Sequence, residues 1–160
     1  MQVPFLDLTA QHRHVKDEIL NLWREVLDTG CFIGGSHIAA LEQEFAAACH
    51  CKHALAVSSG TDALMLIFEA LGLRPGDEVI VPVNTFIATS EAVSKAGGKV
   101  VFVDILPDTY NMDPAAAEAA VTSRTVGIVP VHLYGQMADM DPLMAVAKRH
   151  GLWVVEDSAQ

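Results

Sequence analysis

The sequence is short of basic residues and has no long apolar run, and each shortage excludes a class of protein. Ten lysines and arginines stand against 20 acidic residues, giving a net charge of −10. The chain therefore lacks the basic face that binding to nucleic acid requires. The longest apolar run, 63–68, is far shorter than the roughly 20 residues of a membrane-spanning helix. We expect no nucleic-acid partner and no membrane span.

Cysteine is also scarce, with three residues in the chain. An odd cysteine count and an N-terminus without a secretory signal pattern are typical of a protein from the reducing cytoplasm. Cys49, His50, Cys51 and His53 form a cluster, but structural zinc sites space their paired cysteines more widely and add a second ligand pair. We therefore expect no metal here, and a helix C-terminus with buried thiols.

What the sequence does contain is a regular alternation of strands and helices. Its 160 residues are 51% apolar with a mean hydropathy of +0.31, which suits one domain with a substantial core. Short apolar runs predict strands over 54–57, 78–81, 99–103, 126–131 and 152–155. Helices are predicted over 15–27, 37–49, 62–71, 86–96, 114–121 and 142–150. This order indicates an α/β fold of three layers, a mostly parallel sheet with helices on both faces.

Capping residues support these boundaries. Ser36, Asp113 and Asp141 are the predicted N-caps of three helices, and a proline follows each of the two aspartates. Glycine is expected to end helices at three places, namely Gly30, Gly97-Gly98 and Gly151.

Ligands of parallel sheets bind beyond the carboxyl ends of the strands, so the residues there are the candidates for function. Ser58 to Leu64 form a turn of small residues that runs into a helix N-terminus. Such a turn could bind a phosphate or simply cap the helix. Neither the dinucleotide-binding nor the P-loop fingerprint is present. Phe86, after the next strand, could stack on a planar cofactor or belong to the core.

Polar side chains follow the last two predicted strands. His132 could contact a cofactor or substrate, or satisfy nearby backbone groups. Glu156 and Asp157 end an apolar strand, which is costly unless each carboxylate finds a partner. Strand alternation directs them to opposite faces, so one can face a ligand, and an aspartate there could bind a protonated ring nitrogen. A phosphate site, an aromatic ring and an anion together describe a pyridoxal phosphate site.

Six motifs in their order carry a resemblance to a known family. They are Pro4–Leu8, Ser59–Leu64, Gly76–Pro82, Asn84–Thr89, Val131–Gln136 and Glu156–Gln160. With them the whole chain resembles the DegT/DnrJ/EryC1/StrS family of pyridoxal phosphate-dependent sugar aminotransferases, of fold type I. The resemblance implies that residues 1–35 form an N-terminal segment and helix, and that residues 36–160 belong to the large, cofactor-binding domain.

The same resemblance implies roles for individual residues. The backbone of Gly60 and Thr61 would bind the cofactor phosphate, Phe86 would stack on the ring, and Asp157 would pair with the ring nitrogen. Gln160 would approach the ring hydroxyl. Ser59 and His132 would support these contacts from behind. The amino group would move from glutamate to a nucleotide-linked ketosugar, in a homodimer whose sites are completed by the neighbouring subunit.

One residue of the family pattern is missing from this chain. The lysine that forms the Schiff base follows the aspartate in the family, whereas this chain ends three residues after Asp157. The lysines present are Lys16, Lys52, Lys95, Lys99 and Lys148, and none lies at the carboxyl end of a predicted strand. We therefore expect the N-terminal portion of a longer polypeptide, inactive by itself. A pyridoxamine phosphate-dependent sugar dehydratase and a non-catalytic α/β small-molecule-binding domain stay open as alternatives.

Overall fold

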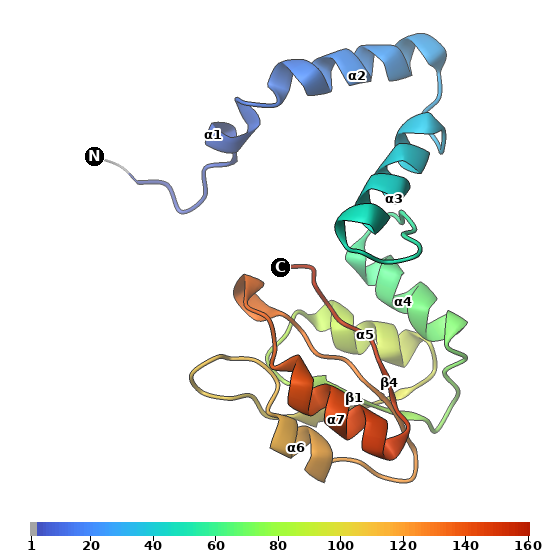
Figure 1. Ribbon diagram of the computed structural model, residues 1–160, viewed down its shortest axis with the longest axis vertical. Helices are drawn as coiled ribbons and strands as arrows, with labels where there is room; N and C mark the ends of the chain where they lie inside the picture. Colours follow the sequence, from blue (N-terminus) through green and yellow to red (C-terminus); the bar gives the residue numbers. More distant parts are fainter. Residues whose placement is uncertain (1–2) are drawn as a thin grey trace. The chain divides into compact units, whose positions relative to one another are not determined.

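The computed structural model describes residues 3–160, which divide into two units (Figure 1). One unit ends at Ala56 and the other runs from Val57 to Gln160. These units are defined by contacts within the chain, so the domain boundary predicted between residues 35 and 36 stays a prediction. In the described part of the chain, no helix is both long and apolar enough to span a membrane.

The first unit consists of helices α1 (Leu8–His12), α2 (Lys16–Thr29) and α3 (Ser36–Ala48). Gly30 ends α2 in the left-handed conformation (φ 68°), as predicted. The prediction for Ser36 is wrong, because Gly35 is the N-cap of α3 and Ser36 is the first helical residue. Gly35 has φ 89°, a conformation that a serine side chain disfavours, so the cap position falls on the glycine.

The cysteine cluster follows the end of α3, as predicted. Its thiols are exposed, however, so the expectation of buried thiols is wrong. The described part of α3 contains no buried residue that could shield them. The Cys51 thiol donates to the His53 carbonyl oxygen at 3.2 Å.

The predicted strand over 54–57 is absent from the sheet. Leu55 is exposed, and the Ala56 N–H donates to a carboxylate oxygen of Glu42 at 2.9 Å instead of to a neighbouring strand. A strand forms only where a second strand pairs with it, and the described residues supply none at this segment.

The second unit is built on a four-stranded parallel sheet in the order β2-β1-β3-β4. The strands are β1 (Glu78–Pro82), β2 (Lys99–Val103), β3 (Thr125–Ile128) and β4 (Trp153–Val154). The helices are α4 (Gly60–Ala70), α5 (Ile87–Lys95), α6 (Pro114–Ala119) and α7 (Met140–His150), with a 3₁₀ turn at Leu133–Gly135. All six predicted helices are present, with ends that differ by no more than two residues.

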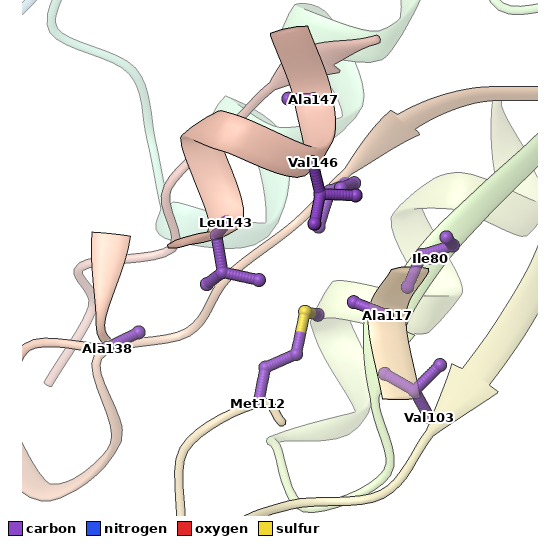
Figure 2. Packing of buried hydrophobic residues seen from close by; sticks show 9 residues of the cluster. Ile80, Val103, Met112, Ala117, Ala138, Leu143, Val146 and Ala147 are labelled. Carbon is purple, nitrogen blue, oxygen red and sulfur yellow. The ribbon is translucent and has the colours of Figure 1, made fainter. Parts of the chain in front are cut away.

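Helices cover both faces of this sheet. Along β1, Ile80 points to a cluster that contains Ala117 of α6 and Leu143 of α7, and Figure 2 shows Leu143 and Met112 directed into the same space. Val79 and Val81 point to the opposite cluster, which contains residues of α4 and α5. The period-2 alternation of a strand thus builds two cores, one on each face. The predicted three-layer α/β fold is confirmed.

The helix starts are set by their capping residues. Asp113 caps α6 as predicted, accepting from the Ala115 N–H at 2.8 Å, and Pro114 is the first helical residue. The prediction for Asp141 is wrong, since α7 begins earlier, at Met140, with Asp139 as its N-cap. Pro142 still lies in the first turn, where an N–H has no acceptor within the helix, so the helix can start before it.

The path of the chain through the sheet locates the region to search for a site. From β1 the chain passes through α5 to β2, and from β3 it passes through α7 to β4 on the other side of the sheet. The direction of the connections therefore reverses between β1 and β3. In open α/β sheets, ligands bind outside the carboxyl ends of the strands at this reversal.

Candidate cofactor site

A cavity of about 300 Å³ opens at the carboxyl edge of the sheet. This volume lies at the lower end of the roughly 300–1,000 Å³ of small-molecule sites. Its lining residues are Gly60, Thr61, Leu64, Thr85, Phe86, Ala88, Val131, Asp157, Ala159 and Gln160. The structure thus brings together all five residues to which the resemblance assigned direct cofactor contacts. Ser59 and His132, assigned supporting places, do not line it.

The N-terminus of α4 forms one wall of the cavity. Ser59 is the N-cap, its Oγ accepting from the Asp62 N–H at 3.1 Å, and its carbonyl oxygen accepts from the Ala63 N–H at 2.9 Å. These bonds leave the N–H groups of Gly60 and Thr61 without an acceptor among residues 3–160. The positive end of the helix dipole lies behind them, so this wall favours an anion.

Asp62, in the first turn of α4, uses its hydrogen-bonding groups within the turn and not toward a bound anion. Its carboxylate accepts from the Ser58 hydroxyl, and its backbone N–H donates to Ser59. The Ser58 hydroxyl, and to a smaller extent the Ser59 hydroxyl, lowers the pKa of the Asp62 carboxyl below its ordinary value. The carboxylate therefore caps the turn that precedes α4.

Phe86 contributes an aromatic ring to a second wall. It follows β1 and is the N-cap of α5. The side chain is 69% exposed and lines the cavity, so it does not belong to either hydrophobic cluster. An exposed ring at a cavity can stack on a planar ligand.

The backbone hydrogen bonds of Asp157 hold it at the third wall. Its N–H donates to the Pro130 carbonyl oxygen at 2.9 Å, and its own carbonyl oxygen accepts from the His132 N–H at 3.0 Å. These bonds extend the pairing of β3 with β4 beyond the ends of both strands, through the bridge between Val131 and Asp157. The position of Asp157 is therefore set by the sheet.

The carboxylate of Asp157 has two hydrogen-bond donors and no countercharge. Oδ1 accepts from the Ala159 N–H at 3.1 Å, and Oδ2 accepts from the Thr89 hydroxyl at 2.7 Å. No lysine, arginine or histidine of residues 3–160 forms an ion pair with it. A cavity with an unpaired carboxylate fits a ligand that carries a protonated ring nitrogen.

Glu156 lies on the opposite face, as the strand alternation predicts. Its Oε2 is 2.9 Å from Nε2 of His132, whose Nδ1 accepts from the Ala138 N–H at 3.1 Å. Because Nδ1 accepts, the ring proton of a neutral His132 is on Nε2 and is donated to Glu156. His132 is buried and satisfies local groups, which is the second of the two alternatives left open above.

Gln160 is held by the turn that follows β3. Its Oε1 accepts from the Tyr134 N–H, and Tyr134 adopts a left-handed conformation with φ 57°.

Asn111 fixes the same turn and was not predicted. The buried Asn111 amide donates to the carbonyl oxygens of Gln136 and Met137, both at 3.1 Å, and accepts from the Leu133 N–H at 3.2 Å.

Two threonines near the cavity were also missed. Thr85 precedes the N-cap of α5 and Thr89 lies in its first turn, with their hydroxyl oxygens 3.0 Å from each other. Because Thr85 lies outside the helix, the spacing of four did not by itself predict their contact. Nothing in the sequence indicates that Thr89 meets Asp157, which is 68 residues away.

The described cavity wall contains no lysine and no metal-binding cluster of side chains. None of the five lysines, all within the described residues, lines the cavity. Over residues 3–160, no group of three histidine, cysteine, aspartate or glutamate side chains is placed to hold a metal ion.

The fold and this cavity define a parallel α/β protein with a cavity at the carboxyl ends of its strands. The family model of the DegT/DnrJ/EryC1/StrS aminotransferase family matches residues 13–160, and the chain belongs to this family. The predicted resemblance is thereby confirmed, as is the fold class, since the similar solved structures include pyridoxal phosphate-dependent aminotransferases of fold type I.

Individual relatives are similar over the whole chain. The pleiotropic regulatory protein of Geobacillus stearothermophilus is 50% identical over 160 residues, which are 100% of this chain and 43% of the relative. The UDP-N-acetyl-3-dehydro-alpha-D-glucosamine 3-aminotransferase of Acidithiobacillus ferrooxidans is 51% identical over 158 residues, 99% of this chain and 43% of the relative.

Solved structures give the same picture. The crystal structure of S. venezuelae DesV is 48% identical and has a TM-score of 0.96, over 99% of this chain and 43% of DesV. An E. coli GDP-4-keto-6-deoxy-D-mannose-3-dehydratase is also similar, with a lower TM-score of 0.79 at 33% identity, over 84% of this chain and 36% of the dehydratase. The chain thus spans less than half the length of these relatives.

Proposed function

We propose that this chain forms the cofactor-binding part of a pyridoxal phosphate-dependent aminotransferase that acts on a nucleotide-linked ketosugar. The observation that carries the proposal is the cavity wall. It combines the free N–H groups at the start of α4, the exposed ring of Phe86 and the unpaired carboxylate of Asp157. These are the three groups that a phosphate, an aromatic ring and a protonated ring nitrogen require.

Each wall has a separate role in this proposal. The N–H groups of Gly60 and Thr61 bind the phosphate, and Phe86 stacks on the ring. Asp157 accepts a hydrogen bond from the ring nitrogen and keeps it protonated, and Gln160 lies beside the ring hydroxyl. Ser59 orients the start of α4, and His132 orients the segment that carries Asp157. When bound, pyridoxal 5′-phosphate supplies an electron sink for the carbon that gains or loses the amino group.

The remaining parts of the reaction lie outside the cavity wall described above. We propose that a lysine following Gln160 binds the cofactor covalently, since no lysine of this chain lines the cavity. Glutamate is the proposed amino donor, and the proposed assembly is a cytoplasmic homodimer whose second subunit completes the site. Relatives named as transaminases of UDP- and dTDP-linked sugars support the substrate class.

A sugar dehydratase is the second candidate, because dehydratases occur among the similar structures. An aminotransferase of this family from Brucella abortus, at 36% identity and a TM-score of 0.95, is more similar to this chain than the E. coli dehydratase, which favours transamination. The resemblance implies that a dehydratase has a histidine in place of the Schiff-base lysine, so the two candidates differ in covalent attachment of the cofactor.

The test uses the intact protein, meaning the whole polypeptide of which these 160 residues are part or all. It is incubated with pyridoxal phosphate, reduced with borohydride and analysed by mass spectrometry with peptide mapping. One reduced adduct on a lysine after Gln160, together with glutamate-dependent amination of a ketosugar nucleotide, supports the proposal. Cofactor binding without an adduct supports the dehydratase, and no cofactor binding contradicts both.

A further inference from the structure

Thr89 holds the carboxylate of Asp157 from behind the cavity. It lies in the first turn of α5, has an exposed fraction of 0% and does not line the cavity. Its hydroxyl oxygen is 2.7 Å from Oδ2 of Asp157. The two residues come from different elements, so this hydrogen bond ties the strand-end segment to the helix that begins after Phe86.

The direction of the hydrogen bond between Thr89 and Asp157 follows from the number of protons that each group can donate. An ionised carboxylate only accepts hydrogen bonds, so the single proton of the Thr89 hydroxyl is donated to Asp157. The Thr89 oxygen is then left as an acceptor, and Thr85, whose oxygen is 3.0 Å away, is the donor. A directed chain of hydrogen bonds therefore runs from Thr85 through Thr89 to Asp157.

The second donor to the carboxylate cannot fix its orientation alone. Oδ1 accepts from the Ala159 N–H, two residues further along the same segment. This local bond ties the carboxylate to its own segment only and not to a second element. The Thr89 hydroxyl adds a fixed point on a helix whose neighbouring residues are buried, and it thereby sets the plane of the carboxylate relative to the cavity.

Packing alone does not require a hydroxyl at this position. Valine has nearly the shape of threonine and would fill the same space on α5. A buried hydroxyl is unfavourable unless it is hydrogen bonded, and here both of its partners lead toward the cavity, since Thr85 and Asp157 line it.

We propose that Thr89 is a positioning residue, whose hydroxyl holds the Asp157 carboxylate in the orientation that binds the ring nitrogen of the cofactor. This inference rests on the proposed function. Thr89 touches neither cofactor nor substrate in it, and acts through Asp157 alone.

The test compares three variants of the intact protein with the wild type. Thr89→Val removes the hydroxyl and keeps the shape, and Thr89→Ser keeps the hydroxyl. Ser90→Ala is the matched control, because Ser90 is a buried hydroxyl on the same helix that donates only to the Ile87 carbonyl oxygen. Apoprotein is titrated with pyridoxal phosphate, and the ¹⁵N chemical shift of the bound ring nitrogen is measured with labelled cofactor.

Thr89→Val is expected to raise the cofactor Kd about tenfold, the size of effect usual for one hydrogen bond to a charged group. Its ring-nitrogen signal should move toward that of the unprotonated ring. Thr89→Ser and Ser90→Ala should keep the wild-type Kd and signal. If Thr89→Val does not fold, Thr89→Ala, which adds no bulk, replaces it in the same comparison.

Wild-type affinity and an unchanged ring-nitrogen signal in Thr89→Val would overturn the inference while leaving the proposed function intact. An equal loss in Ser90→Ala would also overturn it, since the effect would then belong to the helix as a whole. Absence of cofactor binding by the wild type would instead contradict the proposed function itself.

Discussion

The indole ring of Trp153 on β4 lies directly over Gly127 on β3. A Cβ atom at Gly127 would be 2.1 Å from the Trp153 ring, closer than any side-chain contact allows. The ring of Phe68 in α4 also contacts the indole, with the two ring centroids 5.8 Å apart. Gly127 therefore makes room for the tryptophan that joins β4 to the core, and β4 leads directly to Asp157.

Gly127→Ala is expected to destabilise the intact protein by about 1–3 kcal/mol, as overpacking of a core usually does. Replacing the tryptophan as well, in Gly127→Ala/Trp153→Leu, should cost less than the sum of the single changes, because the clash is gone. Chemical denaturation of the four proteins measures this coupling. Strictly additive changes would show that the two residues do not meet.

The buried carboxylate of Glu78 makes stability depend on pH. Its side chain is 2% exposed. The Thr122 hydroxyl, the Arg124 guanidinium and the Lys99 ammonium together lower the pKa of the Glu78 carboxyl from about 4.5 to about 2. Since the folded state has the lower pKa, ionised Glu78 stabilises the fold above pH 4.5, and this contribution is lost as the pH falls from 4.5 toward 2.

Glu78→Gln should therefore lower the melting temperature at neutral pH and approach the wild type as the pH falls through this window. Thermal melts of both proteins between pH 7 and pH 3 give the comparison. Glu118→Gln is a useful control, because Glu118 pairs with Arg149 at an exposed surface and should have a smaller effect. A difference between Glu78→Gln and wild type that stays constant with pH would contradict the account.

Asn111 is expected to be essential for the turn after β3. Asn111→Ala leaves one buried N–H and two carbonyl oxygens without their partner, and should cost about 2–4 kcal/mol. Asn21→Ala, at an exposed asparagine of α2, should change stability by less than about 0.5 kcal/mol. Equal effects in denaturant titrations of the intact variants would show that the turn does not depend on Asn111.

The exposed ring of Phe86 should contribute to cofactor affinity. Phe86→Ala is expected to weaken pyridoxal phosphate binding by about three- to tenfold, since an aromatic pair contributes roughly 0.5–1.5 kcal/mol, whereas Phe86→Tyr should retain it. Phe102→Ala is the control, an exposed phenylalanine on β2 that is not part of the cavity. Fluorescence titration of the apoproteins measures all four affinities. Similar losses at both positions would argue against stacking.

Local sequence patterns predicted the elements of the sheet but only part of their pairing. The apolar run of β1 and the Asp113-Pro114 cap of α6 are encoded by adjacent residues, and both predictions are confirmed. The segment 54–57 has the same apolar character, yet forms no strand, since pairing depends on a neighbour that the run itself does not specify. The strand predicted over 126–131 is β3, which ends at Ile128. A single bridge between Val131 and Asp157 continues the pairing at the predicted end.

The cavity was predictable for a different reason. Parallel strands bring their carboxyl ends to one edge, so Phe86 and Asp157 could be placed together from topology alone. Gly60 also lines the cavity, but the strand over 54–57 that was predicted to lead to it is absent from the sheet. The hydrogen bonds that support these residues could not be predicted in the same way. Thr89 lies 68 residues from its partner Asp157, and Asn111 lies 22–26 residues from its partners. The orientation of the His132 ring was also unpredictable, because it depends on hydrogen bonds to Glu156 and to the backbone of Ala138.

The measurement that tests the central claim most directly compares two adjacent carboxylates. Pyridoxal phosphate is titrated into intact apoprotein carrying either Asp157→Asn or Glu156→Gln. Because Asp157 lines the cavity and Glu156 faces His132, Asp157→Asn should raise the Kd about tenfold or more, and Glu156→Gln should leave it unchanged. Wild-type affinity in Asp157→Asn, or an equal loss in both variants, would contradict the assignment of this cavity as the cofactor site.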